Sequence, residues 1–155
     1  MHDYQDQRTK IFQKLGKAKQ MVLATSLGTR TTARMMSCVV LEGCFYFQTD
    51  RKFLKYEQMR GNPSVAICFD NIQIEGIARE LGHPLAAHNA SIAVAYQQAY
   101  PGSFAAYSAF ETEVLFEVEP VLITCYEYEK HEPVRRIIYC KEKRYSEDWP
   151  LGGTH

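Results

Sequence analysis

Apolar residues recur at helical spacing at the start of the chain and then change to the shorter spacing of strands. From residue 3 to residue 19 most positions are polar or charged. Four apolar side chains interrupt them at helical spacing: Tyr4, Ile11, Phe12 and Leu15. This pattern predicts an amphipathic helix over Asp3–Lys19, with a last turn weakened by Gly16. From Met21 onward the period becomes that of strands.

Seven apolar segments follow, and each has the composition of a strand. They span residues 21–26, 33–41, 44–49, 64–69, 72–81, 113–128 and 134–142. Glu42-Gly43 predicts a tight hairpin turn between the second and third segments, because glycine supplies the positive φ that such turns require. Gly76 predicts a bulge or bend in the fifth segment, and Pro120 predicts an edge position or a bulge in the sixth.

Two further segments have the pattern of helices. Residues 50–60 predict a short helix with Asp50 as its N-cap, ended by Gly61-Asn62-Pro63. Residues 84–100 are rich in alanine and predict a longer helix, ended by Pro101-Gly102. The alanines of this second helix indicate close packing rather than chemistry.

The element count sets the fold class. Six to eight strands with two or three helices in 155 residues predict an α+β fold that is mostly β. We expect a closed or nearly closed antiparallel barrel, since closure removes the exposed edges of a long sheet. No repeat or linker divides the chain, so the sequence predicts one domain over residues 1–155. Its barrel would span about residues 21–142, followed by a C-terminal tail over about 143–155.

Composition and charge narrow the classes of partner. The formal net charge is zero, so no global field would attract nucleic acid or an anionic membrane. Residues 1–60 nevertheless hold 11 Lys and Arg against 5 Asp and Glu. This basic third could serve a local anion such as a phosphate ester, or oppositely charged surfaces could meet within the fold or across a dimer.

The termini and cysteines indicate a cytoplasmic protein. The first ten residues lack the apolar core of a signal peptide, and no apolar stretch approaches the ~20 residues of a membrane span. The five cysteines form no CxxC pair, and most lie in apolar runs as buried thiols do. They also lack the electropositive neighbours that favour a reactive thiolate.

Common catalytic signatures are absent from the sequence. It contains no G-x-S-x-G elbow, Walker loop, GxGxxG or H-E-x-x-H motif. His83 and His88 are the histidines that share one short segment, without a cysteine or carboxylate at metal-ligand spacing. We therefore expect no metal site and name no catalytic acid or base.

The segment from Arg30 to Asn71 carries the candidate chemistry. Arg34 stands in an apolar strand, where an unpaired buried charge would be costly. The next strand ends at Gln48-Thr49, and several cations including Lys55 follow at the start of the expected helix. A hydroxyl, cations and helix-terminal amides could together bind a phosphate. The alternative is a solvated basic face on a short surface helix.

This segment resembles the pyridoxamine 5'-phosphate oxidase-related, FMN-binding split-barrel family, which includes general stress proteins. The resemblance covers about residues 21–80. It rests on an Arg-led apolar strand (Arg34-Met35-Met36), a hairpin, a strand ending in Gln48-Thr49, Lys55, and Asn62-Pro63 before the next strand. It implies an antiparallel, Greek-key-like split β-barrel with two or three flanking helices, and a homodimer with FMN between its subunits.

The resemblance implies eight cofactor-binding residues: Arg34, Met35, Met36, Ser37, Gln48, Thr49, Lys55 and Asn71. In such a site Arg34, Lys55 and the Thr49 hydroxyl bind the FMN phosphate. Main-chain groups of residues 35–37 line one edge of the isoalloxazine, with Gln48 beside it. Asn71 reaches the flavin from the other subunit, where an amide can both donate and accept.

The implied function is an FMN-dependent oxidoreductase of unknown substrate. The C-terminal Arg/His motif that holds the substrate phosphate in pyridoxamine-phosphate oxidases is not found in this tail, so that substrate is not expected. Two alternatives stay open. One is a non-catalytic flavin- or haem-binding sensor, with His83 or His88 as a haem ligand, and the other is use of the deazaflavin F420. Trp149 could stack near the flavin or cover one end of the barrel.

Overall fold

The computed structural model describes residues 3–150, which form eight strands and flanking helices. The strands are β1 (Ala18–Leu27), β2 (Arg30–Leu41), β3 (Cys44–Asp50), β4 (Ser64–Phe69), β5 (Ile72–Glu80), β6 (Glu113–Glu129), β7 (Glu132–Tyr139) and β8 (Arg144–Asp148). The helices are α1 (Tyr4–Leu15), α2 (Leu54–Gly61), the 3-10 helix η1 (Ala87–Asn89), α3 (Ala90–Ala99) and α4 (Pro101–Tyr107).

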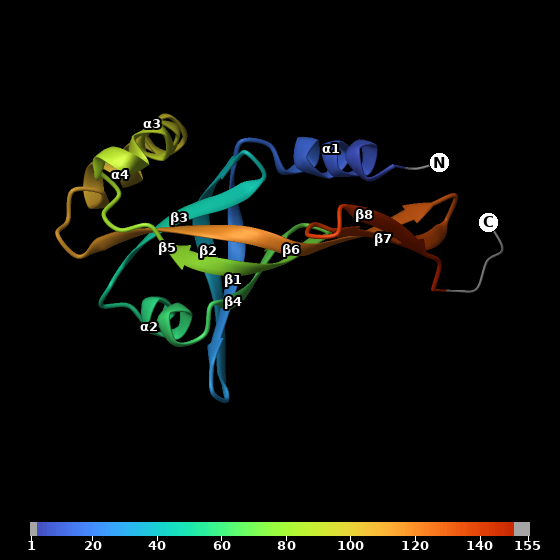
Figure 1. Cartoon of the computed structure of the whole chain (residues 1–155), viewed down its shortest axis with the longest axis horizontal. Helices are drawn as coiled ribbons and strands as arrows, with labels where there is room; N and C mark the ends of the chain where they lie inside the picture. Colours follow the sequence, from blue (N-terminus) through green and yellow to red (C-terminus); the bar gives the residue numbers. More distant parts are fainter. Residues whose placement is uncertain (1–2, 151–155) are drawn as a thin grey trace.

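Six of these strands close into an antiparallel barrel. The sheet order is β3-β2-β1-β4-β5-β6-β7-β8, and β3 also pairs with β6. The first three strands are consecutive hairpin neighbours, and β4 returns beside β1, which is a Greek-key arrangement. The expected α+β split barrel is therefore confirmed. The β7 and β8 strands continue the sheet beyond the barrel (Figure 1).

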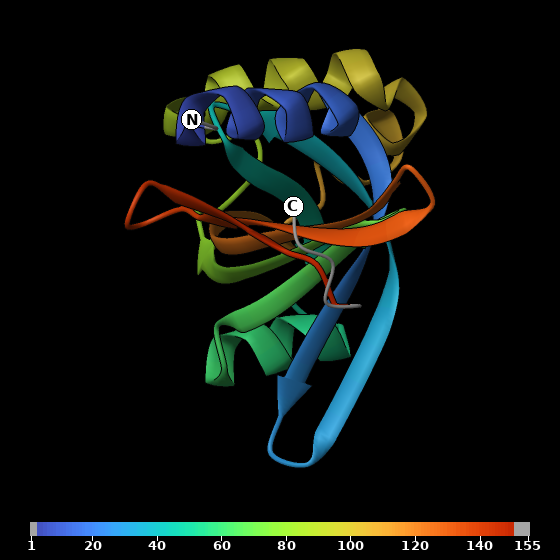
Figure 2. The same cartoon turned by 90° about the vertical axis from the view of Figure 1, so that its right-hand side faces the viewer.

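Helices cover two opposite sides of the barrel. In both views α1, α3 and α4 lie along one side, and α2 lies on the other (Figures 1 and 2). Inside the barrel the largest fully buried side chains include Phe45, Phe47 and Ile74. A second apolar cluster joins Tyr46 on β3 to Tyr96 on α3. The α3 helix is thus packed on the outer face of β2 and β3.

The first helix is shorter than the sequence predicts. Asp3 caps it by accepting a hydrogen bond from the Asp6 amide (2.7 Å), but it ends at Leu15 rather than at residue 19. Gly16 adopts a φ of 69°, which ends the helix, and Ala18 already pairs with Val39 in the sheet. Sheet pairing therefore overrides the polar helical pattern of these last residues.

The second helix also begins later than expected. Asp50 is the last residue of β3 and pairs with Glu113, so it is not a helix N-cap. Its Oδ1 accepts the Lys52 amide at 2.9 Å, which stabilises a turn before α2. Phe53 occupies the N-cap position without a side-chain cap.

The predicted helix over residues 84–100 is divided. It consists of η1 and α3, and the chain then turns at Tyr100 into α4. Pro101 begins α4 instead of ending a helix, because the first helical position needs no N–H donor. The expected tail over 143–155 contains a further strand, β8, and residues 151–155 lie outside the described range.

The turn and bulge predictions are confirmed. Glu42 and Gly43 both have positive φ in the tight β2–β3 turn. The β5–β6 register shifts between Glu75 and Gly76, where Gly76 pairs with Pro120. A Cβ atom on Gly76 would lie 2.8 Å from the carbonyl oxygen of Glu119, so this bulge requires glycine. Among residues 3–150, no helix has the length and apolarity of a membrane-spanning segment.

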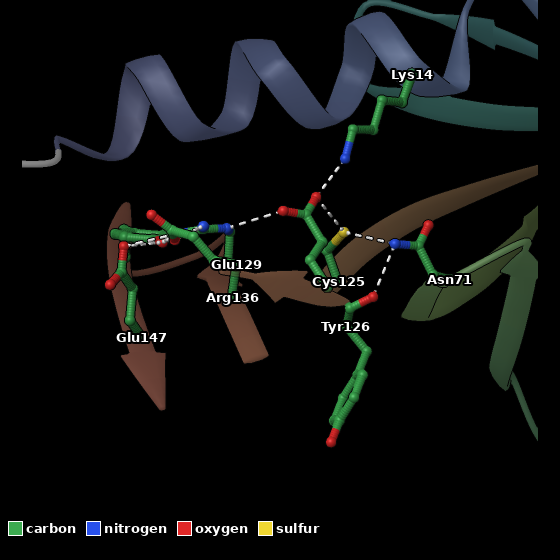
Figure 3. A network of polar contacts seen from close by, with 9 residues as sticks. Lys14, Asn71, Cys125, Tyr126, Glu129, Arg136 and Glu147 are labelled. Carbon is green, nitrogen blue, oxygen red and sulfur yellow. Dashed lines mark hydrogen bonds and ion pairs between the residues drawn. The ribbon is translucent and has the colours of Figure 1, made fainter. Parts of the chain in front are cut away.

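An ion-pair network connects α1 to the β6–β7–β8 extension (Figure 3). Arg136 donates to Glu127 at 3.1 Å and to Glu129 and Glu147 at 2.8 Å each. Lys14 of α1 donates to the other carboxylate oxygen of Glu127. The side chain of Arg136 is only 17% exposed, so this network is partly shielded from water.

The thiol of Cys125 extends the same network into the barrel. It donates to Glu127 at 3.2 Å and lies 3.6 Å from the Asn71 amide (Figure 3). Burial alone would raise the pKa of Glu127, but hydrogen bonds from Lys14, Cys125 and Arg136 outweigh it and lower that pKa to about 2. A carboxylate with a lowered pKa stabilises the fold above its unfolded pKa, and this stabilisation is lost as pH falls toward 2.

We therefore expect Glu127→Gln to destabilise the protein in a pH-dependent way. At pH 7 the free energy of unfolding should fall by roughly 1–3 kcal/mol, because the partly buried Arg136 and the Lys14 ammonium lose their shared partner. The difference from wild type should shrink as the pH falls from ~5 toward 2, where the wild-type carboxylate is itself protonated. Urea unfolding at pH 7, 5 and 3 measures both effects. The exposed Glu142 gives a matched control in Glu142→Gln, and an unchanged difference for Glu127→Gln at pH 3 would contradict the assignment.

Candidate functional site

A cavity of about 260 Å³ lies between the β2–β3 side of the barrel and the α3–α4 segment. It is lined by six of the eight predicted site residues: Met35, Met36, Ser37, Gln48, Thr49 and Lys55. The residues on β2 and β3 are neighbours because these strands form a hairpin, and Lys55 is positioned by the start of α2. Arg34 and Asn71 do not line this cavity.

The hydroxyl of Thr49 is an unpaired polar atom in this cavity. The residue is 3% exposed, and its Oγ1 has no hydrogen-bond partner within residues 3–150. Leaving a buried donor or acceptor unsatisfied costs about 1–3 kcal/mol. By contrast, the neighbouring Gln48 accepts a hydrogen bond from Ser108 at 2.9 Å. The Thr49 hydroxyl is thus available to a ligand that enters the cavity.

Lys55 lines the cavity with this hydroxyl, and the partly buried Arg34, outside the cavity lining, acts on Lys55 electrostatically. Burial lowers the pKa of Lys55, and the positive charge of Arg34 lowers it further. The ammonium of Lys55 lies 4.7 Å from the centre of the Phe53 ring. In the part of the chain that the structure describes, neither Arg34 nor Lys55 forms an ion pair. Cations that form no ion pair within the protein can attract an anionic group of a ligand.

Neutral groups hold the guanidinium of Arg34 in place. Its Nη1 donates to Thr25 Oγ1 at 2.8 Å and to the carbonyl of Leu23 at 3.2 Å, and its Nη2 donates to Thr32. Both threonine hydroxyls donate in turn to the buried side chain of Gln58 on α2. Because these acceptors are uncharged, they orient the guanidinium without neutralising it. Burial lowers the pKa of Arg34.

A buried carboxyl group shares the cavity with Lys55. Glu113 is 5% exposed and opens β6, opposite Asp50. Burial raises the pKa of Glu113 to about 7, the negative charge of Asp50 raises it too, and Lys55 opposes the rise. The pKa of Asp50 is lowered by its hydrogen bond from the Lys52 amide. The cavity therefore contains one group that gains or loses a proton near neutral pH.

Asn71 lies elsewhere in the protomer. Its amide donates to the carbonyl of Tyr126 at 2.8 Å, at the β4–β5 turn (Figure 3). It borders a separate surface depression with Cys68 and Arg135. Within one chain the structure therefore does not bring Asn71 together with the other predicted residues, and its role across a subunit interface stays a prediction.

The histidines considered as ligands bind backbone carbonyls instead. His83 Nε2 lies 2.9 Å from the carbonyl of Phe110, and His88 Nε2 lies 2.8 Å from that of Leu81. Neither lines the cavity. The described residues include no group of three or more His, Cys, Asp and Glu that could hold a metal ion. His2 and His155 lie outside the described residues.

Sequence reasoning missed the other wall of the cavity. This wall consists of Asp50, Phe53, Tyr96, Ser103, Tyr107, Phe110 and Glu113. Tyr96 lies on the alanine-rich helix that we expected to serve packing, and Tyr107 and Phe110 lie beyond the Pro101-Gly102 that we expected to end it. The recurrence of aromatic residues through this stretch was the available signal. Trp149 lies in a separate groove beside α1, with Lys10 and Arg136, and not in the cavity.

The residues present fit the phosphate of a flavin nucleotide. The unpaired hydroxyl of Thr49 can donate to a phosphate oxygen, and the charges of Lys55 and Arg34 can neutralise it. Large apolar side chains stand exposed at the rim, with Met35 58% and Phe53 55% exposed. Exposed apolar surface beside a polar pocket is typical of a binding site for an aromatic ring system.

Comparison with known proteins identifies solved structures that share this fold. No protein-family model matches the chain, and no curated protein matches it in sequence. Similar solved structures include a pyridoxamine 5'-phosphate oxidase-related, FMN-binding protein from Nostoc punctiforme, with 16% identity over 93% of both chains and a TM-score of 0.63. Campylobacter jejuni ChuZ is 12% identical over 97% of this chain and 64% of its own, with a TM-score of 0.74. The haem storage protein HutZ from Vibrio cholerae is 14% identical over 74% of this chain and 89% of its own, with a TM-score of 0.60. The chain therefore has the split β-barrel fold of the pyridoxamine 5'-phosphate oxidase-related proteins.

Proposed function

We propose that this protein binds FMN in the cavity beside Thr49 and acts as an FMN-dependent oxidoreductase on a small-molecule substrate. One observation carries the proposal. Lys55, which forms no ion pair in the described chain, lines the same cavity as the buried and unpaired hydroxyl of Thr49, and the charge of Arg34 is near enough to lower the pKa of Lys55. A phosphate group supplies both the negative charge and the acceptor oxygens that this arrangement lacks.

The chain's own residues would bind and orient the cofactor. Lys55 and Thr49 would hold the phosphate, while Arg34 would add positive charge from beneath α2. The backbone of residues 35–37 would lie along the ring system, and the exposed side chains of Met35 and Phe53 would exclude water from it. Bound FMN would supply the hydride or electron transfer, and the protein would supply position and electrostatics.

Haem is the alternative ligand, because the fold is shared with the haem storage protein HutZ. The cavity favours FMN over haem for two reasons. No histidine or cysteine of the described chain lines it, and its polar groups are arranged for an anion instead of an axial iron ligand. A visible spectrum of the purified protein distinguishes the two, since haem gives a Soret band and FMN does not.

The phosphate site predicts how FMN affinity responds to loss of the two cations. We expect the double variant Arg34→Ala, Lys55→Ala to bind FMN at least about 100-fold more weakly, since each charge-assisted hydrogen bond contributes about 1.5–3 kcal/mol. Quenching of flavin fluorescence measures the dissociation constant. Riboflavin, which lacks the phosphate, should lose much less affinity in the same variant.

The chain offers a matched control for net charge. Lys52 and Arg60 are exposed cations in the same region that do not line the cavity. The variant Lys52→Ala, Arg60→Ala removes the same charge and should bind FMN almost as the wild type does. Because Arg34 supports the fold through Thr25 and Thr32, Lys55→Met alone serves as a second test. Unchanged FMN affinity in both the double variant and Lys55→Met would exclude this phosphate site.

The proposal includes a homodimer in which Asn71 of one subunit contacts the FMN held by the other. Mixed dimers can test this directly. One subunit carries Arg34→Ala and Lys55→Ala, and the other carries Asn71→Ala. If Asn71 acts across the interface, one FMN site of the mixed dimer carries all three substitutions. The other FMN site then carries none of them. Half of the sites should then bind FMN with wild-type affinity, whereas neither parent homodimer has such a site. If Asn71 served its own subunit, no intact site would form, and titration would find none.

A further inference from the structure

Glu113 is a buried carboxyl group whose partners in the protein do not account for its position. It is 5% exposed and lines the cavity at the first residue of β6. Its backbone N–H donates to the carbonyl of Phe110 at 3.1 Å. Its carboxyl oxygens have no hydrogen-bond partner among residues 3–150, and they are not fully enclosed, so they are open to the cavity.

The groups around Glu113 come from four elements. Asp50 faces it across the β3–β6 pair, and Lys55 of α2, Tyr96 of α3 and Tyr107 of α4 line the same cavity. Each oxygen of Asp50 already accepts one hydrogen bond, from the Lys52 amide at 2.9 Å and from the Thr112 hydroxyl at 2.8 Å.

These surroundings favour the neutral form of Glu113. Burial and the fixed negative charge of Asp50 both disfavour a second carboxylate at this point, and the ammonium of Lys55 only partly compensates. A neutral carboxyl group carries an O–H donor that an ionised one lacks. No described protein group accepts this O–H, so in the cavity it can donate to water or to an acceptor on a ligand.

We propose that Glu113 is a further ligand-binding residue of this cavity and donates a hydrogen bond, as the carboxylic acid, to the phosphate of the bound nucleotide. This inference rests on the proposed FMN site. The phosphate would then receive the Thr49 hydroxyl, the Lys55 ammonium and the Glu113 hydroxyl. When FMN binds to protein in which Glu113 is ionised, the carboxylate takes one proton from solvent. An ionised Glu113 beside a phosphate dianion would instead repel it.

In this arrangement the preference of the cavity for FMN over riboflavin depends on pH. Above the pKa of Glu113, which burial and Asp50 raise to about 7, binding must include proton uptake. The dissociation constant for FMN should therefore rise about tenfold per pH unit between roughly pH 7.5 and 9. The FMN phosphate is already a dianion there, since its second pKa is near ~6. Riboflavin offers no phosphate to Glu113, so its affinity should change little over this range.

Fluorescence titrations of FMN and riboflavin at pH 7, 8 and 9 test the proposal. Glu113→Gln keeps a hydrogen-bond donor but cannot ionise, so its FMN affinity should be close to that of the wild type at pH 7 and nearly constant up to pH 9. Calorimetry in buffers of different ionisation enthalpy should show proton uptake on FMN binding at pH 8 in the wild type and none in Glu113→Gln. Glu111→Gln, an exposed change two residues away and outside the cavity, is the matched control and should behave as the wild type.

Asp50→Asn gives an independent test, because removing the charge opposite Glu113 should move the onset of the affinity loss to lower pH. The proposal is overturned if wild-type FMN affinity is constant from pH 7 to 9, or if Glu113→Gln keeps the wild-type pH dependence. Either result would leave FMN binding itself intact. If the wild type binds no FMN at any pH, the proposed function fails and this inference fails with it.

Discussion

The closure of the barrel by β3 and β6 is the interaction on which the candidate site depends. Six residue pairs join these strands, from Phe45 opposite Val118 to Asp50 opposite Glu113. The pairing satisfies the backbone groups of β3 and buries its side chains on both faces, since the barrel core lies on one side and α3 on the other. It also brings Thr49 and Glu113, which are distant in the sequence, to one end of the barrel. The β3–β6 pairing therefore both stabilises the fold and forms part of the cavity wall.

The polar groups behind the cavity explain how Arg34 is held in the fold without an ion pair. Gln58 fixes Thr25 and Thr32, and these fix Arg34, so the guanidinium has donors satisfied by neutral oxygens. An ion pair would stabilise Arg34 more strongly, but it would also cancel the charge that an anion requires. The network beside α1 shows the opposite arrangement, in which Arg136 is surrounded by three carboxylates. Arg136 is thus neutralised within the fold, whereas Arg34 is held by uncharged groups alone.

The sequence predicted features whose cause is local and missed those whose cause is distant. Arg34, Thr49 and Lys55 were singled out because a charge in an apolar strand and a polar strand end followed by cations are patterns of neighbouring residues, and their binding roles stay a prediction. The β8 strand was missed because Arg144–Asp148 has no apolar alternation and forms through pairing with β7. The α4 helix was missed because Pro-Gly also ends helices. Glu113 was not singled out, since its importance arises from burial opposite Asp50, which strand pairing across the barrel determines.

The size and rim of the cavity give a physical reason to expect a second subunit at the site. At about 260 Å³ it is smaller than the ~300–1,000 Å³ that is usual for ligand pockets, so a flavin nucleotide could place only part of its surface inside. The remainder would lie over Met35, Phe53, Tyr107 and Phe110, which are all more than half exposed. Such apolar surface is unfavourable in water, and covering it with both a ring system and a partner chain removes that penalty. The polar end of the cavity would then determine which ligand binds. The apolar rim would link ligand binding to dimer formation, because both the ligand and the partner subunit would cover it.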